Sequence, residues 1–459
     1  MASPIFNLPV EVLQRILLFC TPRDVSTFSR SCRATYSIVY QADDQHLWRE
    51  LYLGHPLDNP YEVVQERRDH KLHARSVDKL NWKERLTEVV KAASLATSSQ
   101  HPTMPDCTQA IRTFHTLLSE LRVACRSKNG SLAECYNSRW LEDTLSGSLL
   151  LENPEEEDVS SEVAKQPSDM PLKRSRLRIS LCKYFDNPSN VNVEDSPFYE
   201  RRMTSRCFVY DLRNYTSSTR WGPFYPSGRP DWVHVDHLMT VVWMNVCELS
   251  AVNLPLPPRG IEAIRAFSAP GSDPKAEDWA GAEGSWSRFV CFMDYRDLFA
   301  FNFSDDGPRS SRMFSDPGFR EAIRLLEVTL KLITPDEYKA YGRGAPDIPA
   351  ESETDEHHPV LFFKGGSRGP HGAESIIRGL VFMDTEGFVK WRLFSVYDST
   401  PQWSSNGVQV GDVGSAIGLV GVWSTAFHET GDPVGPFWMW KNGKEHPPVM
   451  DFPDFDALN

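Results

Sequence analysis

Two histidines, His234 and His237, stand three positions apart in a segment with helical periodicity, which places both rings on one side of a helix. A pair at this spacing is able to ligate one metal ion. No third ligand accompanies the pair at an informative spacing, so the sequence favours a structural or surface role for both rings. We therefore predict no metal site in this chain.

A glycine-rich run over residues 365–372 and an adjacent pair, His428 and Glu429, are the other places where residue types suggest chemistry. A phosphate-binding loop ends in Gly-Lys-Ser or Gly-Lys-Thr and leads into a helix, and the run has neither feature, so we expect a mobile loop. Adjacency in sequence does not make His428 and Glu429 an acid–base pair, because geometry defines a catalytic site. We predict no catalytic residue, no cofactor and no enzymatic activity.

The composition limits the classes of partner. A chain of 459 residues is long enough for two or three domains, and its 40% hydrophobic content is typical of folded proteins. The net charge of −13 argues against a general nucleic-acid binder. Nine cysteines without a Cys-x-x-Cys pair favour a reducing compartment. No run approaches the roughly 18 apolar residues of a membrane span, so we expect a soluble protein of the cytoplasm and/or nucleus.

The elements that would present a binding surface begin near residue 7. Pro9 suits the first position of a helix, and apolar residues then recur at helical spacing: Val12, Leu13, Ile16 and Leu17. Such a helix is too apolar for a small domain that stands alone. It requires a partner.

A second helix is predicted from Thr21, where a threonine cap, Pro22 and Asp24 resemble a capping box. Apolar or aromatic residues follow at spacings of three or four as far as Val39. A short helix with a large aromatic anchor is expected over Leu47–Tyr52.

Residues 8–49 resemble the F-box motif. The matching positions are Leu8, Pro9, Glu11, Val12, Leu13, Ile16, Leu17, Pro22, Asp24, Val25, Ser29, Ser31, Cys32, Arg33, Leu47, Trp48 and Arg49. Tyr36 departs from the motif, since many F-boxes have tryptophan there. The resemblance implies a compact helical module that docks on a Skp-family adaptor, which bridges it to a cullin scaffold.

Recognition of this kind places an apolar stripe of one helix in a groove of the partner. The resemblance assigns adaptor binding to nine residues, of which the last three support the contact: Leu8, Pro9, Val12, Leu13, Ile16, Leu17, Val25, Cys32 and Trp48. The alternative is that these side chains form only the core of a small helical domain.

The rest of the chain has a helical part and a β-rich part. Helices are predicted within 61–96, 109–123 and 231–249, and the acidic run after residue 151 predicts a solvated, mobile loop. The expected domains are an F-box (1–55), linker helices (56–150), the acidic loop (151–175), a substrate-recruiting domain of helix plus antiparallel β (176–445) and a tail (446–459).

Beyond residue 280 the apolar period changes to two, which is typical of strands. Two strands joined by a turn at 294–297 are expected within Phe289–Phe303. Further strands are expected over 326–332, 375–383, 388–397, 407–412, 417–423 and 437–440, and Asp384–Gly387 has the residues of a hairpin turn. The predicted fold class is α+β, with a C-terminal antiparallel sheet or barrel.

The β-rich half has no motif for a ligand. It holds Trp391, Trp403, Trp423, Trp438 and Trp440, which favour a β core first and a binding surface second. Trp438 and Trp440 must share a face of any regular strand. Residues 403–411 and 432–438 resemble C-terminal regions of fungal-type F-box proteins, a likeness that brings no site residue with it.

The function that the sequence favours is that of a substrate-recognition subunit of a Skp–cullin–F-box ubiquitin ligase. The F-box would bind the adaptor, and the β-rich half would recruit an unknown target protein for ubiquitination. Two alternatives stay open: an F-box scaffold outside a cullin complex, and a β-domain that binds a small molecule.

Overall fold

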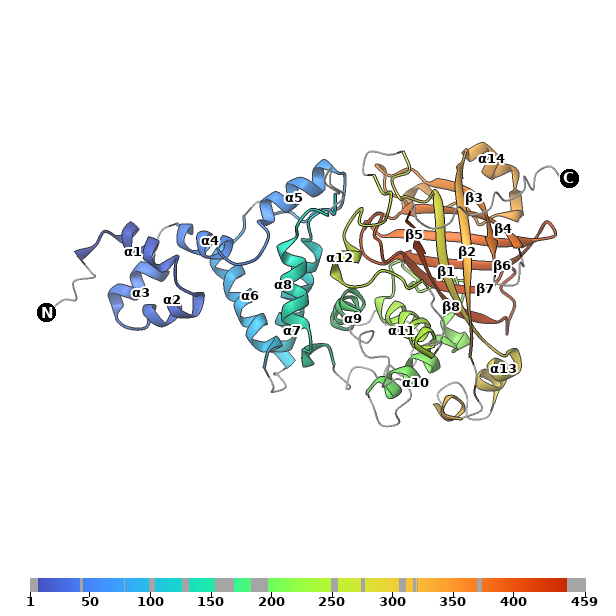
Figure 1. Cartoon of the computed structure of the whole chain (residues 1–459), viewed down its shortest axis with the longest axis horizontal. Coiled ribbons are helices and arrows are strands. Elements are labelled where there is room, and N and C mark those ends of the chain that lie inside the picture. Colours follow the sequence, from blue (N-terminus) through green and yellow to red (C-terminus); the bar gives the residue numbers. More distant parts are fainter. Residues whose placement is uncertain are drawn as a thin grey trace. The chain divides into compact units, whose positions relative to one another are not determined.

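The computed structural model describes residues 7–41, 44–77, 79–98, 104–125, 132–152, 169–182, 197–248, 255–273, 277–304, 311–316, 319, 321–369 and 374–443. The chain forms two compact units (Figure 1). The helical unit comprises Met1–Arg68, Ala74–Arg122 and Glu134–Val159, and the barrel unit comprises Asp69–His73, Val123–Ala133 and Ser160–Asn459. Much of the acidic loop predicted over 151–175, and the tail, lie outside the described residues.

The helical unit is built from short helices. Its described helices are α1 (Val10–Leu17), α2 (Pro22–Ser29), α3 (Arg33–Tyr40), α4 (His46–Leu53), α5 (Pro60–Asp69), α6 (Trp82–Ala96), α7 (Met104–Ser119) and α8 (Tyr136–Leu145). The predicted cap at Thr21 is confirmed, because its side chain accepts a hydrogen bond from the backbone of Asp24 and Asp24 reciprocates.

The helix predicted from Thr21 to Val39 is two helices, and that prediction was wrong. The backbone of Cys32 is extended, with φ −163° and ψ 172°, which ends α2 and starts α3. The Cys32 N–H donates to the Thr35 hydroxyl at 3.1 Å, so the new helix is capped locally. The sequence did not reveal this turn, because the apolar residues keep a spacing of three or four positions on both sides of it.

A buried ion pair ties α6 to the end of α7. Arg85 and Glu120 are both almost fully buried and form a direct ion pair. Nearby, the carboxylate of Asp58 accepts a hydrogen bond from the Asn137 backbone at 2.9 Å, and the Asn137 side chain donates to the Glu120 carbonyl at 2.8 Å. These contacts join segments far apart in sequence into one helical body.

The barrel unit contains a closed antiparallel barrel in which each strand pairs with the next and β8 pairs with β1. Its described strands are β1 (Gly284–Met293), β2 (Glu321–Ile333), β3 (Leu361–Arg368), β4 (Glu374–Met383), β5 (Val389–Tyr397), β6 (Thr400–Gln409), β7 (Leu419–Thr425) and β8 (Val434–Lys441). The predicted α+β class is confirmed, and the β-rich half is a barrel.

Contacts between strands that are not neighbours identify the side chains that face the barrel interior. Trp286 on β1 and Phe363 on β3 both contact Trp391 on β5, with ring centroids 5.4 Å and 5.6 Å apart. Two residues paired directly across neighbouring strands point to the same face of the sheet. Each residue paired with one of these interior side chains therefore also faces the interior, and the strand register identifies the interior positions of every strand. Trp438 and Trp440 share the opposite, outer face of β8, as predicted, and both are buried there.

Helices cover part of the outer surface of the barrel (Figure 1). Helix α11 (Trp232–Glu248) packs on β7, β8, β1 and β2, and it also contacts α9 (Asp169–Leu181) and α10 (Pro197–Val209). Among the described residues, no helix is long and apolar enough to cross a membrane.

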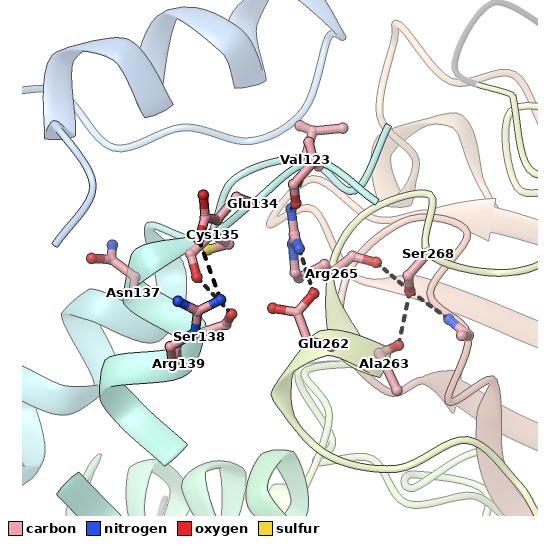
Figure 2. A network of polar contacts seen from close by, with 12 residues as sticks. Val123, Glu134, Cys135, Asn137, Ser138, Arg139, Glu262, Ala263, Arg265 and Ser268 are labelled. Carbon is pink, nitrogen blue, oxygen red and sulfur yellow. Dashed lines mark hydrogen bonds and ion pairs between the residues drawn. The ribbon is translucent and has the colours of Figure 1, made fainter. Parts of the chain in front are cut away.

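One end of the barrel interior is closed by buried apolar side chains from outside the sheet: Leu72, Val123, Phe267, Trp279 and Val413. Arg265, next to the short α12 (Ile261–Ile264), holds this end together (Figure 2). Its guanidinium donates to the Val123 carbonyl at 3.1 Å and to the Ala133 carbonyl at 2.7 Å, and it forms an ion pair with Glu262.

Two other predictions about this unit were wrong. The second strand expected within Phe289–Phe303 is helix α13 (Tyr295–Phe303), because the Asp294 carboxylate accepts a hydrogen bond from the Arg296 N–H at 2.9 Å and caps it. The glycine-rich run does not begin as a loop, because residues 365–368 belong to β3. Residues 370–372 of that run lie outside the described part of the chain.

Candidate adaptor-binding surface

Helix α1 and its flanking turns present an exposed apolar stripe. Its members are Leu8, Val12, Ile16 and Phe19, which expose 41%, 43%, 45% and 88% of their surface. Spacings of four, four and three residues place them on one side of the helix. A single exposed apolar side chain is ordinary, but four aligned ones form a surface that a partner is suited to cover.

The other side of α1 packs inward. Leu13 and Leu17 are one turn apart and almost fully buried, at 3% and 5% exposure. Val25 on α2 and Trp48 on α4 are buried as well. These four of the nine residues predicted to bind the adaptor therefore form the core of the helical module. They support the exposed stripe and are not themselves available for contact with a partner.

The remaining two predicted residues are exposed. Pro9 caps the start of α1, and its carbonyl accepts hydrogen bonds from the Val12 and Leu13 N–H groups at 3.1 Å. Cys32 is exposed at the start of α3, and hydrogen bonds with Thr35 lower the pKa of its thiol. Tyr36, one turn further along α3, is half-exposed.

The stripe differs from the set of residues that sequence reasoning favoured. Phe19 is its most exposed member, yet it lies after the end of α1 and was not among the nine predicted residues. The signal that identifies it is a spacing of eleven residues from Leu8, which is three helical turns.

The two helical histidines are structural. His234 Nε2 lies 3.0 Å from the Tyr215 hydroxyl, and His237 Nδ1 lies 3.0 Å from the Ser205 hydroxyl. Burial lowers the pKa of His234 to about 3 and the pKa of His237 well below its usual value, so both rings are neutral. Within the described residues, no three His, Cys, Asp or Glu side chains are placed to hold a metal ion.

The remaining candidates do not assemble a catalytic site in the part of the chain that the structure describes. His428 stacks on Trp221, with ring centroids 3.9 Å apart, and contacts the Ser424 hydroxyl at 3.0 Å, while no hydrogen bond joins it to Glu429 there. Residues 365–369 also have the Gly-x-Ser-x-Gly spacing of a nucleophile elbow. Ser367 lies within β3, however, and not at a strand-to-helix turn.

Comparison with known proteins agrees with the geometry of α1 to α4. The family model described as F-box-like matches residues 5–54, which contain these helices. No curated protein matches the chain. No solved structure matches it either. Residues 5–54 of this chain are therefore similar to an F-box-like domain, and the same chain contains a β-barrel unit.

Proposed function

We propose that this protein is the substrate-recognition subunit of a Skp–cullin–F-box ubiquitin ligase. The F-box-like domain suggests binding of a Skp-type adaptor. The observation that supports the proposal most is the stripe of Leu8, Val12, Ile16 and Phe19, which is apolar, exposed and backed by a packed core. Covering the exposed parts of these four side chains is worth on the order of 5 kcal/mol before the costs of association.

In this proposal the chain breaks and forms no bond itself. It holds a target protein near the charged conjugating enzyme and so raises the effective concentration of the target. The proposal assigns recruitment of the target to the barrel unit, and the separate compact fold of that unit, with its own core, supports this assignment. The site of action would be the cytoplasm and/or the nucleus.

The adaptor contact is tested by replacing two stripe residues, Val12→Asp and Ile16→Asp, in the full chain. Two carboxylates in the centre of an apolar interface should weaken co-purification of a Skp-type adaptor at least about tenfold, because each must be desolvated. Val10→Asp is the matched control: Val10 is as exposed as Ile16 but lies on another side of α1. It should leave adaptor binding unchanged.

Unchanged binding by the double variant, with an unchanged melting temperature, would rule out the stripe as the docking surface. Co-purification of a cullin with the wild-type chain, but not with the double variant, would support the ligase role. Adaptor binding without any cullin would favour the scaffold alternative. Proteins that accumulate only with the stripe variant are the expected targets.

A further inference from the structure

The barrel interior contains a buried arginine. Arg288 on β1 donates from Nη2 to the Ser405 hydroxyl on β6 at 2.7 Å. Strands β1 and β6 are not neighbours in the barrel, so this hydrogen bond crosses the interior. Arg288 is 3% exposed, and its guanidinium lies 4.4 Å from the centroid of the Phe437 ring.

Arg288 lacks the partner that a buried guanidinium requires. Within the described residues no carboxylate pairs with it, and its Nε has no hydrogen-bond partner. Burial lowers the pKa of Arg288 to about 10, and only Tyr397 opposes that shift. A buried charge of this kind is costly unless an opposite charge accompanies it.

The charged side chains that the described strands place on the interior face are all cationic. Following the register around the barrel, the interior-facing strand positions carry three cationic residues, Arg288, Arg324 and Lys441, and no Asp or Glu in the described strands. The carboxylates of the strands, such as Glu321, Glu327 and Glu374, face outward. This bias occurs in a chain whose net charge is −13.

The interior also changes from apolar to polar along the barrel axis. The end that Phe267 and Trp279 close is lined mostly by apolar side chains, with Gln409 and Lys441 as the polar residues that the described strands place on the interior face there. Toward the other end the register places four buried serines on the interior face: Ser367, Ser375, Ser395 and Ser405. Arg324 is exposed at that end, with its guanidinium 4.8 Å from the centroid of the Phe292 ring.

We propose that the barrel interior binds a carboxylate carried on an apolar body, with the carboxylate against Arg288 and the serine hydroxyls beside it. Arginine binds a carboxylate through two N–H groups, and Nε with one Nη is a common donor pair for this contact. The interior of a closed eight-stranded barrel is either filled by side chains or holds one small ligand, so a small occupant is the largest that this barrel suits. This site does not rest on the proposed adaptor contact, which involves other residues of another unit.

Such a carboxylate occurs on small organic acids and at the C-terminus of a peptide, and the test has an arm for each. The first arm titrates the full chain with hexanoate, decanoate and phenylacetate, and with the corresponding neutral amides. The second arm uses an apolar tetrapeptide with a free C-terminal carboxylate and the same peptide with a C-terminal amide. Tryptophan fluorescence and the melting temperature report binding.

At least one carboxylate should bind saturably and raise the melting temperature, and its neutral counterpart should not. Arg288→Met should weaken that binding at least about tenfold, because a charged hydrogen-bonding partner is lost. Arg378→Met is the matched control, because Arg378 faces outward from β4 and its guanidinium lies over Tyr341. It should leave the affinity unchanged.

The melting temperature of Arg288→Met without ligand separates a binding role from a structural one. Replacing an uncompensated buried charge by an apolar side chain of similar length should leave the melting temperature unchanged or raise it. A variant that unfolds would instead show that Arg288 serves the fold. Unfolding of the variant would overturn the proposal. Equal binding by Arg288→Met and wild type, or failure of every carboxylate to bind in both arms, would also overturn it.

Discussion

Ile16 and Leu17 are neighbours in sequence but face opposite sides of α1: Ile16 exposes 45% of its surface, and Leu17 exposes 5%. The helix therefore separates a surface role from a core role between adjacent apolar residues. Leu17→Asp should unfold the F-box-like module, because it buries an unpaired carboxylate. Ile16→Asp should leave the circular dichroism spectrum and the melting temperature unchanged. Equal loss of stability in both variants would contradict this division.

Removal of one partner of the Arg85–Glu120 ion pair should destabilise the helical unit much more than removal of both partners. Arg85→Met leaves the Glu120 carboxylate buried without its cation, and we expect a loss of about 3–5 kcal/mol in the free energy of unfolding. The double variant Arg85→Met, Glu120→Leu should recover most of that loss, since no charge remains buried. Urea unfolding of the three proteins measures the coupling, and additive losses would count against it.

The barrel should not tolerate a side chain at Gly365. A Cβ atom there would lie 1.8 Å from the carbonyl oxygen of Thr329 on the paired strand β2. Gly365→Ala should therefore separate β2 from β3 locally and cost about 3 kcal/mol or more. Gly443→Ala is the control, because the nearest atom to its added Cβ is 3.9 Å away. Thermal unfolding followed by tryptophan fluorescence compares the two variants.

The barrel unit should lose stability on mild acidification. Burial lowers the pKa of His234 to about 3 in the folded chain, compared with about 6.5 when unfolded, so the unfolded chain binds the proton more tightly. The contribution of His234 is complete above about pH 6.5 and decreases by about 1.4 kcal/mol for each pH unit below it. His237 acts in the same direction, through burial and the nearby Arg201 and Arg178.

This pH dependence is measured by urea unfolding between pH 8 and pH 5. His234→Gln cannot be protonated and should have a shallower decline of stability below pH 6.5 than the wild type. A parallel decline in both proteins would show that other groups control the acid sensitivity.

The sequence predicted the elements better than their contacts. The cap at Thr21, the β2 strand and the hairpin turn at Asp384–Gly387 follow from local rules, and Gly387 has the positive φ, 88°, that the turn requires. Helix α13 was missed because its aromatic residues have the composition of a strand, and Asp294 suits a turn as well as a cap.

The sequence predicted part of the apolar stripe on α1, but it did not predict the polar site in the barrel interior. The spacing of Val12 and Ile16 signalled a stripe, but the sequence did not separate it from Leu13 and Leu17, because an apolar helix in a small module has two apolar faces. Arg288 and Ser405 are 117 residues apart. Only closure of the barrel brings them together, so no local pattern indicated the pair.

Closure of the barrel also restricts how a target protein could be captured. In an open sheet the outermost strand offers free N–H and C=O groups, to which an extended peptide adds as a further strand. Here β8 pairs with β1, and where that pairing stops, the carbonyl of Cys291 accepts a hydrogen bond from the Trp423 indole at 3.0 Å. If the barrel recruits a target as proposed, side-chain chemistry and shape must select that target, and recognition would be sensitive to the identity of its individual residues.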